Sequence, residues 1–217
     1  MGRMQCMCAH YEAVSKPERL HDTFKVVMPT GAVADIWPGY AGIFIRHPKE
    51  RQEGDGQAPW REAMAGSFGL IPHWAKDPSL AKKTYNARSE TVASKPSYRD
   101  AWRLGRRCII PAEAFYEPDW RSGRAVPTRI ARADGKPMGI AGIWTGLRAP
   151  DGSVWRSMSM LTVNADQHPL MKNFHRPEDE KRMVVILDDR DFDAWLDPGL
   201  RTPELMLRCL DAATLCV

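Results

Sequence analysis

The sequence lacks every segment that would place it in or across a membrane. No apolar run reaches the ~18 residues that a transmembrane helix needs, and the first ten residues contain no apolar stretch of the kind found in secretory signals. Cysteine is also scarce: five residues, an odd number, with no spacing typical of a disulfide framework. We therefore expect a cytoplasmic protein that has no membrane partner.

Patterns of metal ligands are missing as well. Cys6 and Cys8 are too close together for a zinc-binding pair, and no second pair of cysteines or histidines completes a set of four ligands. The sequence accordingly predicts no metal and no cofactor.

The composition is that of an ordinary globular domain, with 43% hydrophobic and 27% charged residues. A length of 217 residues favours one domain over the whole chain, 1–217. Residues 46–66 are polar and rich in glycine, and their first part, 46–58, is expected to be a surface loop. The net charge of +4 permits a partner that carries phosphates without requiring one.

Apolar runs bounded by turn residues predict a largely antiparallel sheet. The expected strands are 24–28, 43–46, 108–111, 114–117, 127–131, 138–144, 154–163 and 183–187, with hairpin signals at 134–135 and 151–152. Capping signals predict short helices from Ser15 to about Asp22, over 77–83, between Ser97 and Gly105, after Asp191, and after a Thr202 cap. Together these elements predict an α+β fold with a curved, barrel-like sheet and short helices around it.

Cys8 follows Met7, which could itself be an initiator methionine. Removal of that methionine would give Cys8 a free α-amine beside its thiol. An amine of this kind condenses with an aldehyde to a Schiff base, and the thiol can then close a five-membered thiazolidine. The alternative is that Cys8 is a small buried residue at the start of a strand.

Asn86 and Arg88 lie in the polar stretch YNARSET, between two of the expected helices. Asn can donate and accept hydrogen bonds, and Arg can bind a phosphate with two of them, so the pair suits an anionic substrate. The alternative is a turn asparagine and a solvated arginine.

Glu117 follows Phe115 and Tyr116, and an apolar setting would raise its pKa toward that of a general acid or base. Glu113 is a rival, because the period of a strand places both on one face. His175 lies in a charged loop and suits proton transfer near neutral pH. Its rivals are three other histidines, at positions 10, 73 and 168.

Eight tryptophans accompany a basic central region. Most should belong to the core. Exposed aromatic rings among cations, however, fit the stacking of unpaired bases along a nucleic-acid backbone. The candidates for DNA binding are Arg88, Trp74, Lys82, Lys83, Arg106 and Arg107.

Five motifs follow one another along the chain: Met7-Cys8, GLIPHWAKD, YNARSET, RRCIIPAEAFYEP and the late His175 before RMVVIL. In this order they resemble the SOS response-associated peptidase family, whose members shield abasic sites in DNA. The resemblance covers the chain from Cys8 to about Leu187. It implies a partly closed β-barrel with surrounding helices, in agreement with the α+β expectation.

The resemblance also implies roles for individual residues. Cys8 would form a thiazolidine with the ring-opened aldehyde of an abasic site in single-stranded DNA. Asn86 would orient the amine and the sugar, and Arg88 would contact a phosphate. Glu117, which the family motif selects over Glu113, would transfer protons during Schiff-base formation, and His175 would hold or protonate the opened sugar. The family suggests a monomer.

The sequence departs from the family pattern at several places: Phe68 stands where Trp is usual and Val184 where Pro is common, and two further departures concern the expected site. Ala9 and His10 replace a glycine and an arginine near the expected site entrance, and residues 1–7 precede Cys8. We expect these seven residues to be removed or not translated, since a free amine at Cys8 requires it. Two alternatives stay open: a cysteine peptidase that acts mainly on its own N-terminus, with Cys8 as nucleophile and His175 as base, and a non-covalent single-stranded DNA-binding module.

Overall fold

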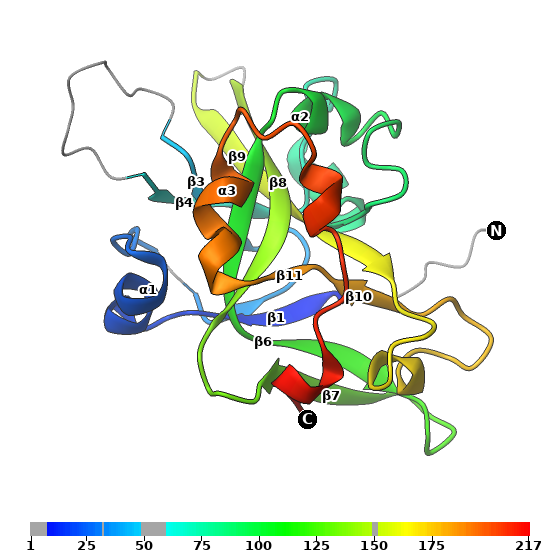
Figure 1. Cartoon of the computed structure of the whole chain (residues 1–217). Coiled ribbons are helices and arrows are strands. Elements are labelled where there is room, and N and C mark those ends of the chain that lie inside the picture. Colours follow the sequence, from blue (N-terminus) through cyan, green and yellow to red (C-terminus); the bar gives the residue numbers. More distant parts are fainter. Residues whose placement is uncertain (1–7, 32, 49–59, 149–151) are drawn as a thin grey trace.

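The computed structural model describes residues 8–31, 33–48, 60–148 and 152–217. Its α-helices are short: α1 (Pro17–Phe24), α2 (Arg99–Arg103) and α3 (Phe192–Leu196) (Figure 1). Five 3-10 helices accompany them: η1 (Pro78–Lys83), η2 (Met171–Asn173), η3 (Asp189–Asp191), η4 (Pro203–Met206) and η5 (Ala212–Thr214). None of these helices is long and apolar enough to cross a bilayer.

The strands of this described part form one sheet around a closed barrel. They are β1 (His10–Ala13), β2 (Asp35–Ile36), β3 (Ala41–Arg46), β4 (Glu62–Phe68), β5 (Asn86–Arg88), β6 (Arg107–Asp119), β7 (Val126–Arg132), β8 (Met138–Arg148), β9 (Val154–Asn164), β10 (Arg182–Val184), β11 (Ile186–Leu187) and β12 (Leu215–Cys216). The barrel closes through β8, β9, β4, β3 and β6, because β6 pairs with β8. Most pairs are antiparallel; β4 and β5 run parallel to β9. The expected α+β fold with a barrel-like, mainly antiparallel sheet is therefore confirmed.

Strand β6 belongs to two parts of the sheet. Its first half, up to Ala112, pairs with β8 in the barrel, and its second half, from Ala114, pairs with β7 outside it. Between these halves Glu113 is skipped in the register with β1, which is the mark of a β-bulge. The bulge re-aims the residues that follow, so Glu117 leaves the barrel and faces the segment before β1.

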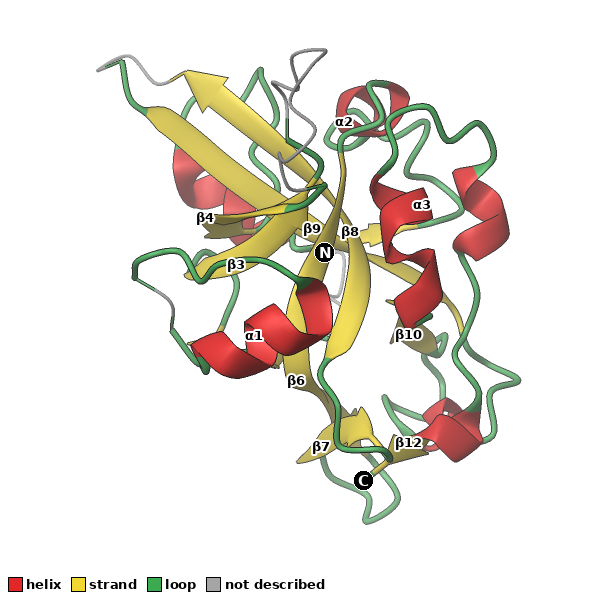
Figure 2. Ribbon diagram, turned by 60° about the vertical axis from the view of Figure 1, so that its left-hand side comes forward, coloured by secondary structure: helices red, strands yellow, loops and turns green. Residues whose placement is uncertain are grey.

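Two apolar cores hold this arrangement. One fills the barrel and includes Phe44, Phe68 and Met158. The other lies outside the barrel, where α1 and α3 pack on it with Phe24 and Trp195 (Figure 2). The helices are amphipathic and too short to be stable alone, so their packing on the barrel keeps them folded.

Several expected elements are confirmed with longer bounds. The runs 108–111 and 114–117 form one strand, β6, and the run 183–187 is divided into β10 and β11. β8 and β9 pair antiparallel on either side of the hairpin signal at 151–152, of which residue 151 lies outside the described residues. Arg46 ends β3, and most of the expected loop over 46–58 lies outside the described residues.

Other expectations are wrong. Residues 24–28 form no strand, because α1 continues to Phe24 and Lys25 then caps it in the left-handed conformation (φ 59°). The Asp134-Gly135 turn does not make a hairpin, since β7 and β8 pair with different halves of β6 rather than with each other. Neither Ser15 nor Thr202 caps a helix through its side chain: α1 has Lys16 at its N-cap, and no side-chain bond caps η4.

Candidate active site

A cavity of about 610 Å³ opens where the second half of β6 meets the segment that enters β1. Its lining comes from the start of the described chain, from residues 116–127 in the middle, and from the later segment 175–179, with Trp37 in addition. The lining residues are Cys8, Ala9, His10, Trp37, Tyr116, Glu117, Pro118, Trp120, Ala125, Pro127, His175, Arg176 and Asp179. Three of the four residues that the sequence assigned to catalysis are among them.

Cys8 is buried at one end of this cavity. The register of β1 on β6 places His10 opposite Tyr116, so the residues before β1 run beside Glu117 and Pro118. The backbone N–H of Cys8 donates a hydrogen bond to Glu117 Oε1 at 3.2 Å. The nitrogen and the carboxylate that the proposed chemistry requires are therefore in direct contact.

Glu117 is almost fully buried, and its burial raises the pKa of its carboxyl well above the usual range. Hydrogen bonds from the Cys8 backbone and side chain act in the opposite direction and lower this pKa, with a smaller effect. The second oxygen of this carboxyl, Oε2, lies 3.3 Å from His175 Nε2. A carboxyl of raised pKa between a nitrogen and an imidazole can pass a proton to either side.

His175 is held by an unusual backbone. Its φ is +61°, a left-handed conformation that few non-glycine residues adopt. The N–H of His175 donates to the carbonyl of Pro118 at 2.8 Å, next to Glu117. A strained conformation fixed in this way is common at functional sites, because the surrounding structure must stabilise it.

Asn86 also contacts Cys8. It begins β5, which runs parallel to β9 with Asn86 opposite Met160. Its Nδ2 donates to the Cys8 carbonyl at 3.2 Å, and its own carbonyl accepts a bond from the Tyr98 hydroxyl at 2.9 Å. The structure thus brings Cys8, Asn86, Glu117 and His175 together. Their catalytic roles remain predictions.

Of the four rival candidates, His10 lines the cavity, and the other three lie in other contacts. Glu113, the residue at the bulge, forms two hydrogen bonds with Arg19 of α1. His73 pairs with Asp100, and His168 bonds the Leu210 carbonyl at 2.8 Å.

An aromatic wall of the cavity was not foreseen from the sequence. The His10 ring stacks between Trp37 and Tyr116, with centroid distances of 4.3 and 4.2 Å. Across the cavity Arg176 lies 5.0 Å from the centre of the Trp120 ring. The only sequence signal was the abundance of tryptophan, which does not distinguish Trp37 and Trp120 from core residues.

Four candidates for DNA contact are at least partly exposed. Arg88 shares β5 with Asn86, and its Nη1 donates to Glu180 Oε2 at 2.8 Å. Trp74 is half exposed. Lys82 and Lys83 project from η1, and the Lys82 stem passes over Gly39, two residues after Trp37 of the cavity wall.

The other two candidates face elsewhere. Arg106 lies over the Trp144 ring and lines a separate hollow of about 260 Å³ beside α2. Arg107 is buried, and its guanidinium donates to the carbonyls of Trp195 and Asp197. Arg107 therefore serves the packing of α3 on the barrel, and we leave it out of the DNA contacts proposed below.

No set of three or more His, Cys, Asp or Glu side chains within the described ranges is placed to hold a metal ion.

Solved structures show the same architecture. A crystal structure of a protein from Bordetella bronchiseptica superimposes with a TM-score of 0.86 at 43% sequence identity, over 96% of this chain and 97% of that one. A second, from Bacteroides thetaiotaomicron, has a TM-score of 0.77 at 20% identity and covers 96% of this chain and 90% of that one, so it supports the fold alone.

Curated relatives carry a common description. The abasic site processing protein YoqW of Bacillus subtilis is 34% identical over 64% of this chain and 59% of its own length. The abasic site processing protein HMCES of Gallus gallus is 30% identical over 74% of this chain and 52% of its own length. The chain thus spans between half and three fifths of these relatives. The sequence model for "SOS response associated peptidase (SRAP)" matches residues 7–215, so the chain belongs to the SRAP family, as its motifs suggested.

Proposed function

We propose that this protein processes abasic sites in single-stranded DNA by capturing their aldehyde on Cys8. The observation that carries the proposal is the contact of the Cys8 nitrogen with the buried Glu117 carboxyl, which His175 approaches from its other oxygen. Relatives described as abasic site processing proteins support the substrate class.

The reaction balances with the groups at the site. The α-amine of Cys8 adds to C1′ of the ring-opened sugar, and the resulting carbinolamine loses water to give an imine. Glu117, whose burial raises its pKa, supplies the proton that the departing hydroxyl needs. The Cys8 thiol then adds across the C=N bond, its proton passes to nitrogen, and a thiazolidine results.

The remaining residues orient these steps. Asn86 holds the Cys8 carbonyl and with it the direction of the amine. His175 hydrogen-bonds the opened sugar and exchanges protons with Glu117. Positioned proton transfers of this kind contribute roughly 10²–10⁴ in rate. An intact nucleotide has no aldehyde, so the chemistry itself distinguishes the lesion.

A free α-amine at Cys8 is part of the proposal. Residues 1–7 must then be absent from the active form, either because translation starts at Met7 and that methionine is removed, or because the peptide bond before Cys8 is cleaved. We further propose a monomer that contacts phosphates through Arg88, Lys82 and Lys83 in the cytoplasm.

Intact-mass measurement tests this function. Versions of the protein that begin at Met1 and at Met7 are purified and incubated with an abasic-site oligonucleotide, an undamaged oligonucleotide, or neither. We expect a species that begins at Cys8 and gains the mass of the DNA strand minus one water, with the lesion only.

Cys8→Ala is the matched control and should form no adduct. An exposed Cys8 that leaves the abasic strand free would contradict the proposal. Reversible binding that is equal for both oligonucleotides and unchanged in Cys8→Ala would instead support the non-covalent DNA-binding module.

A further inference from the structure

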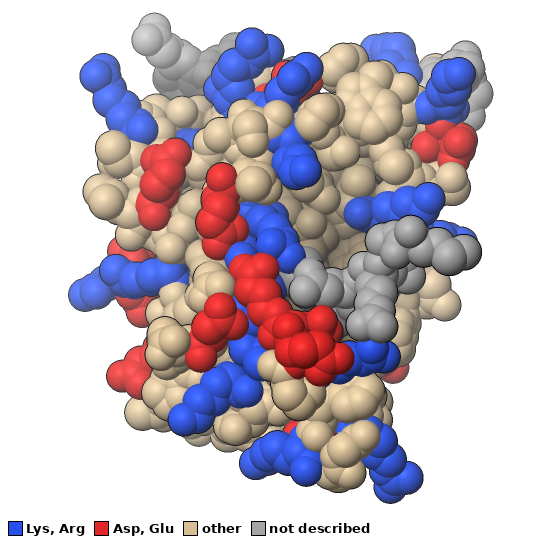
Figure 3. Space-filling model, turned by 90° about the vertical axis from the view of Figure 1, so that its right-hand side faces the viewer, with Lys and Arg blue, Asp and Glu red and all other residues tan. Residues whose placement is uncertain are grey.

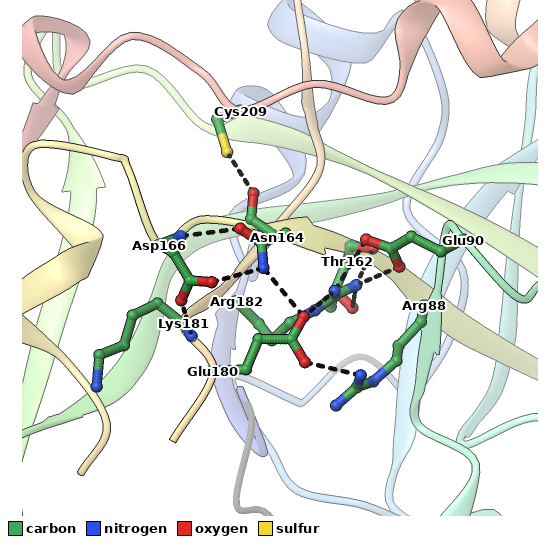
Figure 4. A network of polar contacts seen from close by, with 9 residues as sticks. All are labelled: Arg88, Glu90, Thr162, Asn164, Asp166, Glu180, Lys181, Arg182 and Cys209. Atoms are coloured by element: carbon green, nitrogen blue, oxygen red, sulfur yellow. Dashed lines mark hydrogen bonds and ion pairs between the residues drawn. The ribbon is translucent and has the colours of Figure 1, made fainter. Parts of the chain in front are cut away.

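A network of charged side chains joins β5, which carries Asn86, to the segment that follows the cavity residues His175, Arg176 and Asp179 (Figure 4). Arg182, at the start of β10, is buried and donates from both terminal nitrogens to Glu90, at 2.9 and 2.8 Å. The same guanidinium reaches Glu180 Oε1 at 2.8 Å. The other oxygen of Glu180 accepts the 2.8 Å bond from Arg88. Glu180 therefore bridges a buried arginine and an arginine at the surface.

The charges of this network already balance. Two guanidinium groups, of Arg88 and Arg182, face two carboxylates, of Glu90 and Glu180. Burial raises the pKa of both carboxyls, but the hydrogen bonds and the charge of Arg182, with smaller contributions from their other partners, outweigh it and lower the pKa of each, so both are ionised at neutral pH. Asn164 adds a further hydrogen bond to Glu180 at 3.2 Å. Glu180 thus stays in place through Arg182 and Asn164 even if Arg88 turns to another anion.

We propose that Glu180 is a specificity-determining residue that restrains the attraction of Arg88 for DNA phosphates. This inference rests on the proposed function, in which Arg88 contacts the backbone beside the lesion. A phosphate that binds Arg88 must approach a guanidinium whose charge Glu180 partly neutralises, and it must do so close to a carboxylate that Arg182 holds in position.

The surroundings strengthen this effect. The face on the side of the 175–182 segment carries acidic side chains near its centre, among basic ones (Figure 3). Asp179, in the same segment, lines the cavity and adds to this effect, whereas Glu178 is exposed to solvent, which screens its charge. Phosphate contacts attract every strand, damaged or not. Weakening one of them lowers the time spent on undamaged DNA and leaves discrimination to the covalent step.

The test compares two variants that each remove one negative charge. Glu180→Gln loses the partner of Arg88, and its amide oxygen can still accept a bond from Arg182. Glu178→Gln is the matched control, because Glu178 is exposed, lies two residues away and has no described ion pair. Binding of an undamaged fluorescent single-stranded oligonucleotide is measured by anisotropy at several salt concentrations.

We expect Glu180→Gln to bind undamaged DNA about two- to fivefold more tightly, the range of an exposed ion pair. Its plot of log affinity against log salt should also steepen by up to about 0.7, which corresponds to one additional phosphate contact on a single strand. Glu178→Gln should change the affinity by less than about 1.5-fold, because solvent screens a distant charge. With abasic DNA, Glu180→Gln should lower the DNA concentration at which the crosslinking rate is half-maximal. The maximal rate should change by a smaller factor.

A double-mutant cycle separates the specific effect from net charge. In an Arg88→Gln background, Glu180→Gln should no longer tighten binding. Equal gains from Glu180→Gln and Glu178→Gln, or a gain that persists without Arg88, would overturn the inference while leaving crosslinking intact. Failure of the wild-type protein to crosslink abasic DNA would instead overturn the proposed function, and the inference with it.

Discussion

The carboxyl of Glu117 is buried in a setting that disfavours its charge, and this has a measurable effect on stability. In the unfolded chain the group ionises near its ordinary pKa of about 4.3. In the folded protein burial raises its pKa well above that value. Between the two pKa values the folded state therefore holds one proton more, and the free energy of unfolding falls as pH rises, by at most about 1.4 kcal/mol per pH unit.

Glu117→Gln should remove this dependence. Relative to the wild-type protein, the variant should gain stability as the pH rises above about 5, until Glu117 ionises in the folded wild-type protein, as measured by urea unfolding at each pH. At the same time its rate of crosslink formation should fall by roughly 10²–10⁴, because Gln donates no proton to the carbinolamine. If the free energies of unfolding of the wild-type protein and the variant change in parallel above pH 5, Glu117 is not protonated in the folded protein.

The residue scale also shows what sequence reasoning could find. The motifs alone led to Cys8, Asn86, Glu117 and His175, although these residues are up to 167 positions apart in the sequence. Strand periodicity could not choose between Glu113 and Glu117, because it assumes an unbroken strand. The bulge at Glu113 breaks that period, and no local signal announced it. The stacking of His10 between Trp37 and Tyr116 was missed because it depends on the pairing of distant segments.

At the scale of elements, the connection from β4 to β5 decides where Asn86 lies. Gly69 follows β4 with φ +120°, and a Cβ atom there would lie 1.9 Å from the carbonyl oxygen of Ala81 in η1. Only glycine allows η1 to pack this closely, and β5 follows directly after η1.

Gly69→Ala should therefore lower the free energy of unfolding by about 2–4 kcal/mol, the combined cost of an unfavourable φ and of backbone overlap. Gly135→Ala is the control: its φ is +71°, and a Cβ there would meet nothing within 4 Å. It should cost about 1 kcal/mol, from the left-handed conformation alone. If Gly69→Ala and Gly135→Ala lower the free energy of unfolding equally in chemical denaturation, η1 moves away from Gly69 at little cost.

Elements were predictable where the chain is apolar over many residues, as in β6, β8 and β9. Strands were missed where a polar segment becomes a strand only because it pairs with a segment far away in the sequence. β5 is the clearest case: the stretch around Asn86 forms a strand because β9 offers it a free edge. The false strand at 24–28 arose from apolar residues that pack against the outer core without pairing, as Val26 does.

At the scale of the molecule, the last residues tie the end of the chain to the outer part of the sheet. β12 pairs with β7 through Leu215 and Arg132, and Leu215 packs against the core that fills the barrel. The C-terminal segment thereby stabilises β7, the strand that pairs with the second half of β6.

Leu215→Ala should cost about 2 kcal/mol and lower the melting temperature by roughly 4–8 °C, because it removes a mostly buried side chain from that core. Val217→Ala, at a position that is 64% exposed, should change stability by less than about 0.5 kcal/mol. Calorimetry of both variants checks this. A loss in Val217→Ala as large as that in Leu215→Ala would show that the stabilising contact lies elsewhere in the tail.

The long sequence separation between Cys8 and its partners has a consequence for the timing of synthesis. The Cys8 nitrogen bonds a residue 109 positions later, and His175 lies further on. At about 5–20 residues per second, a ribosome needs roughly 8–33 s to add the residues from Cys8 to His175. Throughout this interval the nascent chain carries Cys8 without the groups that direct its reactivity. Under the proposed function, the site that selects an aldehyde is therefore assembled only after His175 has been synthesised.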